Sequence, residues 1–487
     1  MMKLNLEVAQ TVDSSPVIVV DLDGTLTPVD TLHETVLQLH RTSPQAAIGL
    51  VQALRQGKAA FKRHVAQSLS LDGALLPLRQ DLLEWLTEQH ELGRRIVLVS
   101  AADQAFVDAV AAHLPFRVDA AIGSDGLANL SGEAKLARIR EMVGENFVYA
   151  GDAAVDLPIW RASRGAILVG RGMRFEKRLG DVPVVGRFPQ EGGGPLRAWL
   201  RALRIYQWPK NLLVFLPVLL AGPMAGIGDW GQAVLAFLML SVLASAGYLV
   251  NDLLDLAADR QHPTKRSRPF ASGALPVAHG VAAVPGLLLV AVLLGLFLPL
   301  ASLLVGFVYL CGTLVYSFFL KKVPMLDAIV LASLFTLRIV AGIVLMTLPW
   351  SFWLLTFSMF FFLSLALLKR FTELREVSQS PDRELRRRGY TTDDLTLLLS
   401  MGSSSGIAAC VIFVMYLMEE QFSRSIYASP EWLWVILVLL LYWLGRVWQL
   451  AVRGHMNEDP LLFALRDRVS HLIGLGAIVF ILLARAA

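Results

Sequence analysis

Long apolar runs fill the second half of the chain, whereas the first 200 residues mix short apolar runs with polar segments. From about Leu212 onward, the runs are long enough to predict membrane-spanning helices. Nine are expected, at 211–228, 230–250, 280–299, 301–319, 325–347, 351–368, 398–418, 431–452 and 470–485. The pattern therefore predicts a soluble unit followed by an all-α transmembrane bundle of nine helices.

Four short apolar runs in the first part predict the strands of a parallel sheet. They are VIVVDLD (17–23), RIVLVSA (95–101), NFVYAGD (146–152) and AILVG (166–170). Helical patterns separate these runs, as in a doubly wound α/β (Rossmannoid) fold. Ligands of such sheets bind beyond the carboxyl ends of the strands. The polar residues at those ends are Asp21, Asp23, Ser100 and Asp152.

These strand ends resemble the haloacid-dehalogenase-like (HAD) phosphatase superfamily over roughly residues 15–185, and its phosphoserine-phosphatase-like branch most of all. The resemblance rests on four motifs. DLDGTLT contains Asp21 and Asp23, VLVSA contains Ser100, SGEAKLARI contains Lys135, and GDAAVD contains Asp152 and Asp156.

The HAD resemblance implies Mg²⁺-dependent hydrolysis of a phosphomonoester. Asp21 is the expected nucleophile, and Asp23 is the expected acid and base for the leaving alcohol. Ser100 and Lys135 would bind the phosphoryl oxygens, and a helical insert at about 31–93 would form a substrate-selecting cap. A degenerate domain kept as a scaffold, and a solvated surface position for Lys135, are the alternatives. The expected magnesium ligands and their neighbours are Asp21, Asp23, Asp152 and Asp156.

Three aspartates follow the second long apolar run, in NDLLDLAADRQHPTKRSRP (251–269). Asp252, Asp255 and Asp259 fall at i, i+3 and i+7, so a helix would present them on one face. At the centre of a bilayer each would cost about 2.5–3.5 kcal/mol, so we expect this face to bind a cation or to open to water. Carboxylates suit Mg²⁺, and the basic residues that follow suit a diphosphate. These are Lys265, Arg266 and Arg268.

This aspartate stretch is similar to the first signature of the UbiA superfamily of intramembrane prenyltransferases, over about residues 200–487. The resemblance implies Mg²⁺ on Asp252, Asp255 and Asp259, with Asn251 beside the substrate and catalysis through the first two aspartates. Where the superfamily has a second aspartate-rich motif, this chain reads LLKRFTELREVSQSPDRELRRRGY (367–390). Fewer acids and more cations at this place favour a donor that carries an additional phosphate.

With RIYQWPKNLLVF (204–215) and NEDPLLFALRDR (457–468), this departure resembles the decaprenyl-phosphate phosphoribosyltransferase group. The resemblance implies phosphoribosyl pyrophosphate as the donor and a polyprenyl phosphate as the acceptor. The alternatives are that the basic residues named below only set the membrane topology, and that the charged residues only form salt bridges with one another. The expected substrate contacts are Lys210 and Asn211, then Lys369, Arg370 and Glu373 near the 5-phosphate, and Lys265, Arg266 or Arg268 at the leaving group.

The two resemblances together imply two consecutive reactions, because the transferred ribosyl group would carry a 5-phosphate and a HAD domain hydrolyses phosphomonoesters. The product would be polyprenyl-phosphoryl ribose. One alternative is a transferase that joins a prenyl diphosphate to an aromatic or other acceptor. Another is a noncatalytic membrane scaffold whose HAD domain senses a phosphorylated ligand.

Charge distribution predicts the orientation in the membrane. Lys and Arg are concentrated in the loops after the second, fourth, sixth and eighth expected spans. By the positive-inside rule these loops, the N-terminal domain and both active sites are expected on the cytoplasmic side of a bacterial-type inner or plasma membrane. The net charge of +4 requires no nucleic-acid partner, since topology and anionic lipids account for it.

The join between the two parts is expected at residues 190–210. QEGGG (190–194) reads as a flexible linker, and the amphipathic segment after it reads as an interfacial helix. The expected domains are therefore 1–189 and 211–487. Cys311 and Cys410 lie in apolar spans, so no disulfide is predicted.

Overall fold

The computed structural model describes most of the chain. The chain folds into two compact units. Met1–Leu203 and Tyr248–Pro285 form the first, and Arg204–Gly247 and Gly286–Ala487 form the second. The domain bounds expected at 189 and 210 stay a prediction. The described residues are 15–42, 55, 58–68, 73–125, 129–190, 194–221, 225–346, 350–378, 384–385, 389–422, 427–456 and 459–486.

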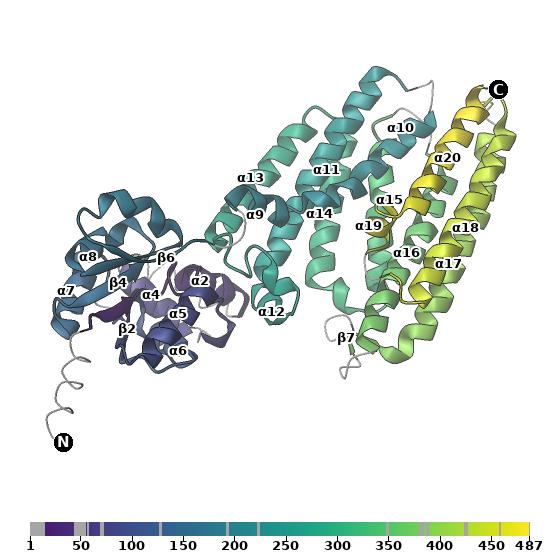
Figure 1. Cartoon of the computed structure of the whole chain (residues 1–487). Coiled ribbons are helices and arrows are strands. Elements are labelled where there is room, and N and C mark those ends of the chain that lie inside the picture. The colour runs from purple at the N-terminus through teal and green to yellow at the C-terminus, as the bar shows by residue number, and fades with distance from the viewer. Residues whose placement is uncertain are drawn as a thin grey trace, which may run out of the picture. The chain divides into compact units, whose positions relative to one another are not determined.

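A six-stranded parallel sheet forms the centre of the first unit (Figure 1). The strand order is β3-β2-β1-β4-β5-β6, which confirms the predicted α/β fold. Strand β1 is fully buried and pairs with β2 on one side and β4 on the other, so Asp21 follows the middle strand. The strands are β1 (Val17–Val20), β2 (Ile96–Asp103), β3 (Ala120–Ser124), β4 (Phe147–Gly151), β5 (Gly165–Val169) and β6 (Val184–Phe188).

Helices pack on both faces of this sheet because successive β1 residues point to opposite sides. Ile18 and Val20 belong to one hydrophobic core, and Val17 and Val19 belong to the other, with Trp160. The segment expected as a cap is mainly helical in its described residues, with 76–79 outside any helix. The helices are α2 (Thr31–Thr42), α4 (Lys58–Ser68), η1 (Gly73–Leu75), α5 (Gln80–Glu91), α6 (Gln104–Ala111), α7 (Glu133–Val143), η2 (Ala154–Asp156), α8 (Leu157–Ala162), η3 (Gly170–Arg178) and α9 (Gly194–Ala202).

The aspartate stretch also belongs to the first unit, through α12 (Leu256–Gln261) and the 3₁₀-helix η6 (Lys265–Ser267). Arg260 of α12 forms a bidentate ion pair with Glu34 of α2, with Nη1 2.7 Å from Oε2. The two side chains are 6% and 1% exposed. Close by, Gly273 has φ +74°, and a Cβ there would lie 2.6 Å from Pro28. The stretch is therefore packed against the segment that follows the DLDGTLT motif.

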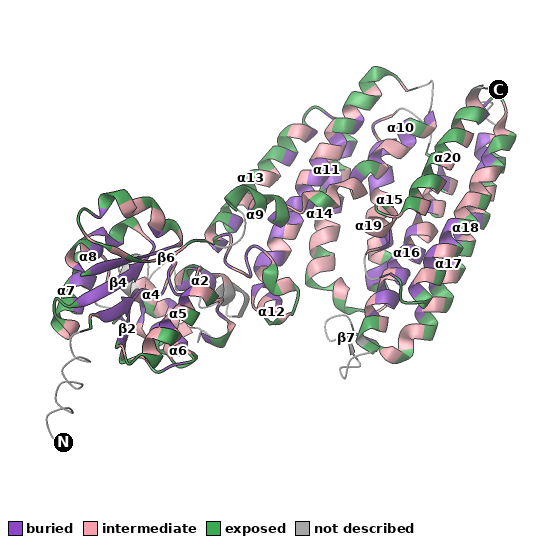
Figure 2. Cartoon of the chain, viewed as in Figure 1, coloured by how far each residue is buried: buried purple, intermediate pink, exposed green. Residues whose placement is uncertain are grey.

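Within the described residues, eight helices are long and apolar enough to cross a membrane. They coincide with eight of the nine expected spans. Apolar side chains such as Leu289, Phe307 and Leu475 are exposed on three of them (Figure 2), as expected of surfaces covered by lipid. The helices are α11 (Ile227–Leu254), α13 (Val277–Gly295), α14 (Leu300–Phe318), α15 (Leu326–Ile343), α16 (Phe352–Ser378), α17 (Leu395–Tyr416), α18 (Leu433–Val452) and α20 (Arg468–Ala486).

The first expected span, 211–228, is not a single α-helix, so the count of nine is not confirmed. A 3₁₀-helix, η4 (Ile205–Val214), is followed by the seven-residue α10 (Phe215–Ala221). Pro209 lies inside η4 and Pro217 inside α10. Proline removes a backbone donor and clashes with the preceding turn, so a regular helix is interrupted. The remaining elements of the second unit are η7 (Leu320–Lys322), β7 (Glu384–Leu385), β8 (Tyr390–Thr391), η8 (Thr392–Asp394), the π-helical η9 (Leu417–Gln421), η10 (Pro430–Trp432) and α19 (Pro460–Ala464).

Candidate functional sites

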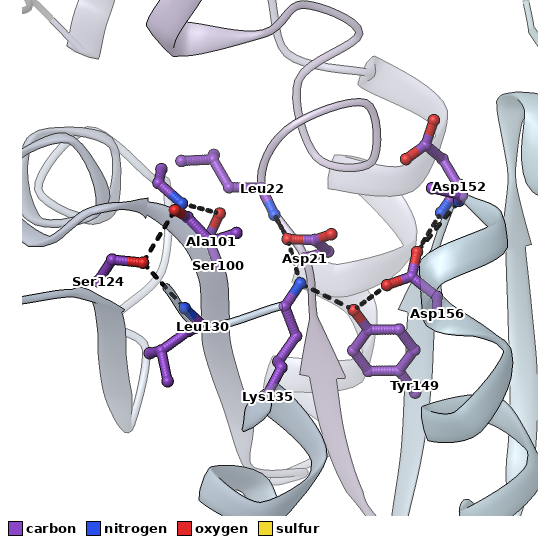
Figure 3. Close-up of polar contacts among 12 residues, drawn as sticks. Asp21, Leu22, Ser100, Ala101, Ser124, Leu130, Lys135, Tyr149, Asp152 and Asp156 are labelled. Atoms are coloured by element: carbon purple, nitrogen blue, oxygen red, sulfur yellow. Dashed lines mark hydrogen bonds and ion pairs between the residues drawn. The ribbon is translucent and has the colours of Figure 1, made fainter. Parts of the chain in front are cut away.

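A buried lysine lies beside the first aspartate of the DLDGTLT motif (Figure 3). The Nζ of Lys135, on α7, is 2.9 Å from Asp21 Oδ1, which also accepts a hydrogen bond from the Leu22 amide. Because Lys135 is only 2% exposed, the alternative of a solvated surface lysine is wrong. The fold thus brings together a carboxylate and an ammonium group that are far apart in the sequence.

Tyr149 connects this pair to the GDAAVD motif. Lys135 Nζ donates to the Tyr149 hydroxyl at 3.1 Å, and that hydroxyl donates to Asp156 Oδ1 at 2.9 Å. The other carboxylate oxygen of Asp156 accepts from the amides of Asp152 and Ala153. Figure 3 shows this chain of contacts from Asp21 to Asp156. Tyr149 was not predicted, although a tyrosine in a fully buried strand needs a partner for its hydroxyl.

The acids around Asp21 repel one another in a dehydrated site. Burial, and then the neighbouring charges of Asp30 and Asp21, raise the pKa of Asp23 to about 7. Burial and the Asp21 charge raise the pKa of Asp156 to about 6, and both also act to raise the pKa of Asp152. A divalent cation with oxygen ligands would offset this repulsion. The donor set therefore fits Mg²⁺.

The loop between β1 and α2 approaches the Asp152 side chain closely. Gly24 has φ +78°, and a Cβ at this position would lie 2.6 Å from the Asp152 carboxyl carbon. The glycine of DLDGTLT is thus required both by its backbone conformation and by the close approach. Within the described residues, no group of three or more His, Cys, Asp or Glu side chains is arranged to hold a metal, so the predicted ligand sets stay predictions.

Three further side chains, those of Asp23, Ser100 and Lys62, frame the site around Asp21. Asp23 Oδ1 accepts from the Thr31 amide at the start of α2, and the buried Ser100 accepts from the Ala102 amide. From α4, Lys62 donates to the Ala101 carbonyl at 2.6 Å. Burial lowers the pKa of Lys62, against the attraction of Asp23, Asp30 and Asp21. Lys62 lies in the expected cap but was not among the predicted site residues.

The three aspartates of the 251–269 stretch are divided between two helices, so the prediction of one continuous helical face is wrong. Asp252 is on α11, Asp255 lies at the break, and Asp259 is on α12. Arg268 joins the outer two, with Nη1 2.9 Å from Asp252 Oδ1 and 2.6 Å from Asp259 Oδ2. Asn251, Asp255 and Lys265 are half-buried, and Arg266 is exposed.

Both outer aspartates are buried, which fits a cation site. Asp259 Oδ1 is inaccessible to solvent and has no hydrogen-bond partner among the described residues. A buried carboxylate oxygen without a partner is costly, and a metal ion would satisfy it. Arg268 was expected at the leaving diphosphate; its observed contacts are with the aspartates themselves, and its predicted role is untested.

In the second unit, one carboxylate is shared by two lysines. The Nζ atoms of Lys210 and Lys369 are each 2.9 Å from Asp459 Oδ2. Burial would raise the pKa of Asp459, but the charges of Lys369 and Lys210 hold it well below its usual range. Asn211, next in sequence to Lys210, donates to Ser241 at 2.9 Å. The structure thus brings together three residues from η4, α16 and the NEDPLLFALRDR stretch.

An apolar cavity of about 340 Å³ has Lys210 among its lining residues. Eight of its ten lining residues lie in the two stretches that carried the phosphoribosyltransferase resemblance, 204–215 and 457–468. Lys210 is the charged residue of a lining that is otherwise aliphatic or aromatic, which is the character of a site for a ligand with a long apolar chain and an anionic head. The other lining residues are Pro209, Leu212, Leu213, Phe215, Leu216, Leu219, Leu461, Ala464 and Leu465.

Arg370, expected at the donor 5-phosphate, is held by protein carboxylates. Its side chain is 1% exposed, and Nε lies 2.7 Å from Asp327 Oδ2. Glu373 also pairs with it, and the Tyr390 hydroxyl donates to the other oxygen of Asp327. These contacts favour a structural role, while phosphate binding by Arg370 and Glu373 stays a prediction.

Arg370→Gln should therefore destabilise the protein, by about 3–5 kcal/mol, because Asp327 would be left as an uncompensated buried charge. Lys369→Gln is the matched control, since Lys369 is 31% exposed and its loss should cost about 1 kcal/mol or less. Thermal unfolding in detergent measures both. Equal stability of Arg370→Gln and wild type would contradict the structural role.

Comparisons with known proteins agree with both motif sets. Residues 212–469 match the model of the UbiA prenyltransferase family, and residues 18–161 match haloacid dehalogenase-like hydrolases. The chain is 40% identical to the uncharacterized protein y4nM of Sinorhizobium fredii, over 94% of this chain and 89% of that protein. It is 33% identical to decaprenyl-phosphate phosphoribosyltransferase of Mycobacterium tuberculosis, over 57% of this chain and 90% of that protein. The solved structure of a UbiA homologue from Archaeoglobus fulgidus covers 58% of this chain and 99% of its own, with 14% identity and a TM-score of 0.46.

Proposed function

Because the chain belongs to the UbiA prenyltransferase family, we propose that it transfers a 5-phosphoribosyl group from phosphoribosyl pyrophosphate to a polyprenyl phosphate. We propose further that its haloacid dehalogenase-like domain then removes the 5-phosphate, so that the final product is polyprenyl-phosphoryl ribose. Both sites would act on the cytoplasmic side of this integral membrane protein.

The observation that carries the transferase proposal is the similarity to decaprenyl-phosphate phosphoribosyltransferase, which spans nine-tenths of that relative. The cavity lined by Lys210 supports it, because an apolar cavity whose lining includes a cationic residue suits a polyprenyl phosphate better than an aromatic acid. The near full-length similarity to y4nM indicates that both parts of the chain have counterparts in a single relative.

In the transferase step, the aspartate stretch would bind the donor diphosphate. Asp252, Asp255 and Asp259 would hold Mg²⁺, which when bound supplies positive charge against the leaving pyrophosphate. Arg268 orients two of these carboxylates. The acceptor phosphate oxygen attacks C1 of the ribose, the bond from C1 to the pyrophosphate oxygen breaks, and positive charge develops on C1 in between.

In the phosphatase step, Asp21 attacks phosphorus and forms an aspartyl-phosphate, while Asp23 protonates the departing ribose O5. Lys135, 2.9 Å from Asp21, is placed to stabilise negative charge on the transferred phosphoryl group. Tyr149 and Asp156 fix the position of the lysine ammonium. Asp21 and Asp152 are the proposed magnesium ligands, and Asp23, now basic, activates water for the second half of the reaction.

The test is incubation of the purified protein with Mg²⁺, labelled phosphoribosyl pyrophosphate and a polyprenyl phosphate, with the lipid products identified by mass. The proposal expects the phosphoribosyl lipid first and its dephosphorylated form later. If label never enters the lipid, and a prenyl diphosphate is instead consumed with an aromatic acceptor, the chain is a prenyltransferase of the ordinary kind.

A further inference from the structure

A buried arginine in the membrane region has only neutral partners among the described residues. Arg338 lies in α15 and is 5% exposed. Its guanidinium donates to Asn211 Oδ1 at 2.7 Å, to the Leu334 carbonyl at 2.6 Å and to the Tyr309 hydroxyl at 2.8 Å. These contacts satisfy hydrogen bonds but do not compensate the charge. An ionised side chain within a membrane span is costly, so an uncompensated one indicates a functional site.

Arg338 and Lys210, one of the two lysines that share Asp459, both lie close to the ring of Phe335. The ring centroid is 5.0 Å from Arg338 Cζ and 5.9 Å from Lys210 Nζ. The hydrogen bond from Arg338 to Asn211 also fixes the residue that follows Lys210. Burial lowers the pKa of Lys210 to about 8, Asp459 opposes this shift, and the charges of Lys369 and Arg338 add to it. The three cations therefore act on one another electrostatically.

The charges of this group, Lys210, Lys369, Arg338 and Asp459, do not balance. Among the residues that the structure describes, three cationic side chains accompany one carboxylate, which leaves two positive charges in excess in a largely buried region. A phosphate monoester carries about −1.5 to −2 charges at pH 7. A single phosphomonoester would therefore neutralise the group, whereas a carboxylate ligand would neutralise only half of the excess.

We propose that the group formed by Lys210, Lys369 and Arg338 binds the phosphate of the polyprenyl phosphate acceptor, with the apolar chain in the cavity that Lys210 helps to line. Lys210 and Lys369 contact the phosphate. Arg338 is a positioning residue. It holds Asn211 through a hydrogen bond and adds positive charge near the phosphate without contacting it. The inference rests on the proposed acceptor. It assigns Lys369 to the acceptor phosphate, whereas the sequence had suggested the 5-phosphate of the donor. The cavity decides between these two phosphates, since ribose has no apolar chain to fill it.

Direct binding to the full-length protein in detergent tests this assignment without catalysis. The probes are farnesyl phosphate, farnesol and ribose 5-phosphate, measured by calorimetry. Lys210→Gln should weaken binding of farnesyl phosphate by about ten- to a hundredfold, the loss expected for one charge-assisted contact. Arg338→Gln should weaken it by about tenfold, because Asn211 loses its partner and the group loses one positive charge. Binding of farnesol and ribose 5-phosphate should not change.

Two controls separate charge from folding. Arg338→Lys keeps the charge and should recover most of the affinity for farnesyl phosphate. Arg446→Gln removes an arginine from another span, α18, where Asp467 already compensates it at 2.7 Å, and this change should leave all three affinities as in wild type. Thermal unfolding of each variant establishes that it is folded.

The results that would contradict the inference can be told apart from those that would contradict the proposed function. Wild-type affinity for farnesyl phosphate in folded Lys210→Gln and Arg338→Gln would overturn the inference, and so would a selective loss of ribose 5-phosphate binding, which would return the group to the donor. If wild type itself does not bind farnesyl phosphate, the inference fails together with the proposed acceptor. If wild type transfers ribosyl groups to the lipid while the variants bind normally, only the inference fails.

Discussion

Asp252→Asn should abolish ribosyl transfer, by more than about a hundredfold, in a protein that remains folded. Asp252 is buried and contacts Arg268 through Oδ1. Asparagine keeps the volume and one oxygen, and Arg268 keeps its second contact with Asp259, so the local packing survives. The lost property is the negative charge that a hard cation such as Mg²⁺ requires of its ligands. The measurement is incorporation of labelled ribose into polyprenyl phosphate.

The matched control for Asp252→Asn is Asp229→Asn, at the opposite end of the same helix, α11. Asp229 accepts a hydrogen bond from the Gly226 amide and has no proposed role in binding. It should keep full transfer activity. If Asp252→Asn also keeps full activity, the aspartate stretch is not the metal site of the transferase.

Asp21→Asn should remove phosphatase activity by more than about a thousandfold and leave ribosyl transfer intact. An amide of nearly the same volume cannot form the acyl-phosphate, and it also loses the charge that pairs with Lys135 at 2.9 Å. The proposed transferase ligands are other residues. Lipid that carries the 5-phosphate should therefore accumulate, and mass spectrometry of the lipid fraction measures it.

A surface carboxylate of the same domain is the control for this change. Asp108→Asn alters an exposed residue of α6 and should still yield the dephosphorylated lipid. The sequential proposal is wrong if wild type and Asp21→Asn give the same phosphorylated lipid while the wild-type domain hydrolyses another phosphomonoester. The phosphatase would then act on a soluble substrate.

The central strands could be predicted from sequence, and the edge strands could not. Strands β1 and β4 are fully buried runs of Val, Ile, Phe and Tyr, which is the strongest strand signal. Strand β3 reads AAIGS and β6 alternates between half-buried and exposed residues. Both occupy the edges of the sheet, where few apolar side chains are needed. Their sequences therefore resemble loops.

The candidate site residues could also be predicted only in part. A sequence motif identifies residue types, but it does not show which side chains they contact. Asp21 and Asp152 were recognisable from DLDGTLT and GDAAVD, whereas Lys62 and Tyr149 become site residues only through contacts made by the fold. Arg370 was expected at the donor 5-phosphate, and the structure adds that Asp327 and Glu373 pair with it. Arg338 shows the reverse, because a lone arginine in an apolar span does not reveal that its partners are neutral.

The buried pair between Glu34 and Arg260 constrains how such a chain can evolve. In the intact chain, replacing Glu34 alone would leave Arg260 as a buried cation without its carboxylate, at a cost of about 3–5 kcal/mol. A protein built from the membrane region alone lacks both Glu34 and the helix that covers Arg260, so the arginine would be more exposed and would not carry this cost. Loss of the N-terminal part therefore removes the need for a cation at position 260. Among relatives that keep both parts, the two positions should vary together, although 226 residues separate them in the sequence.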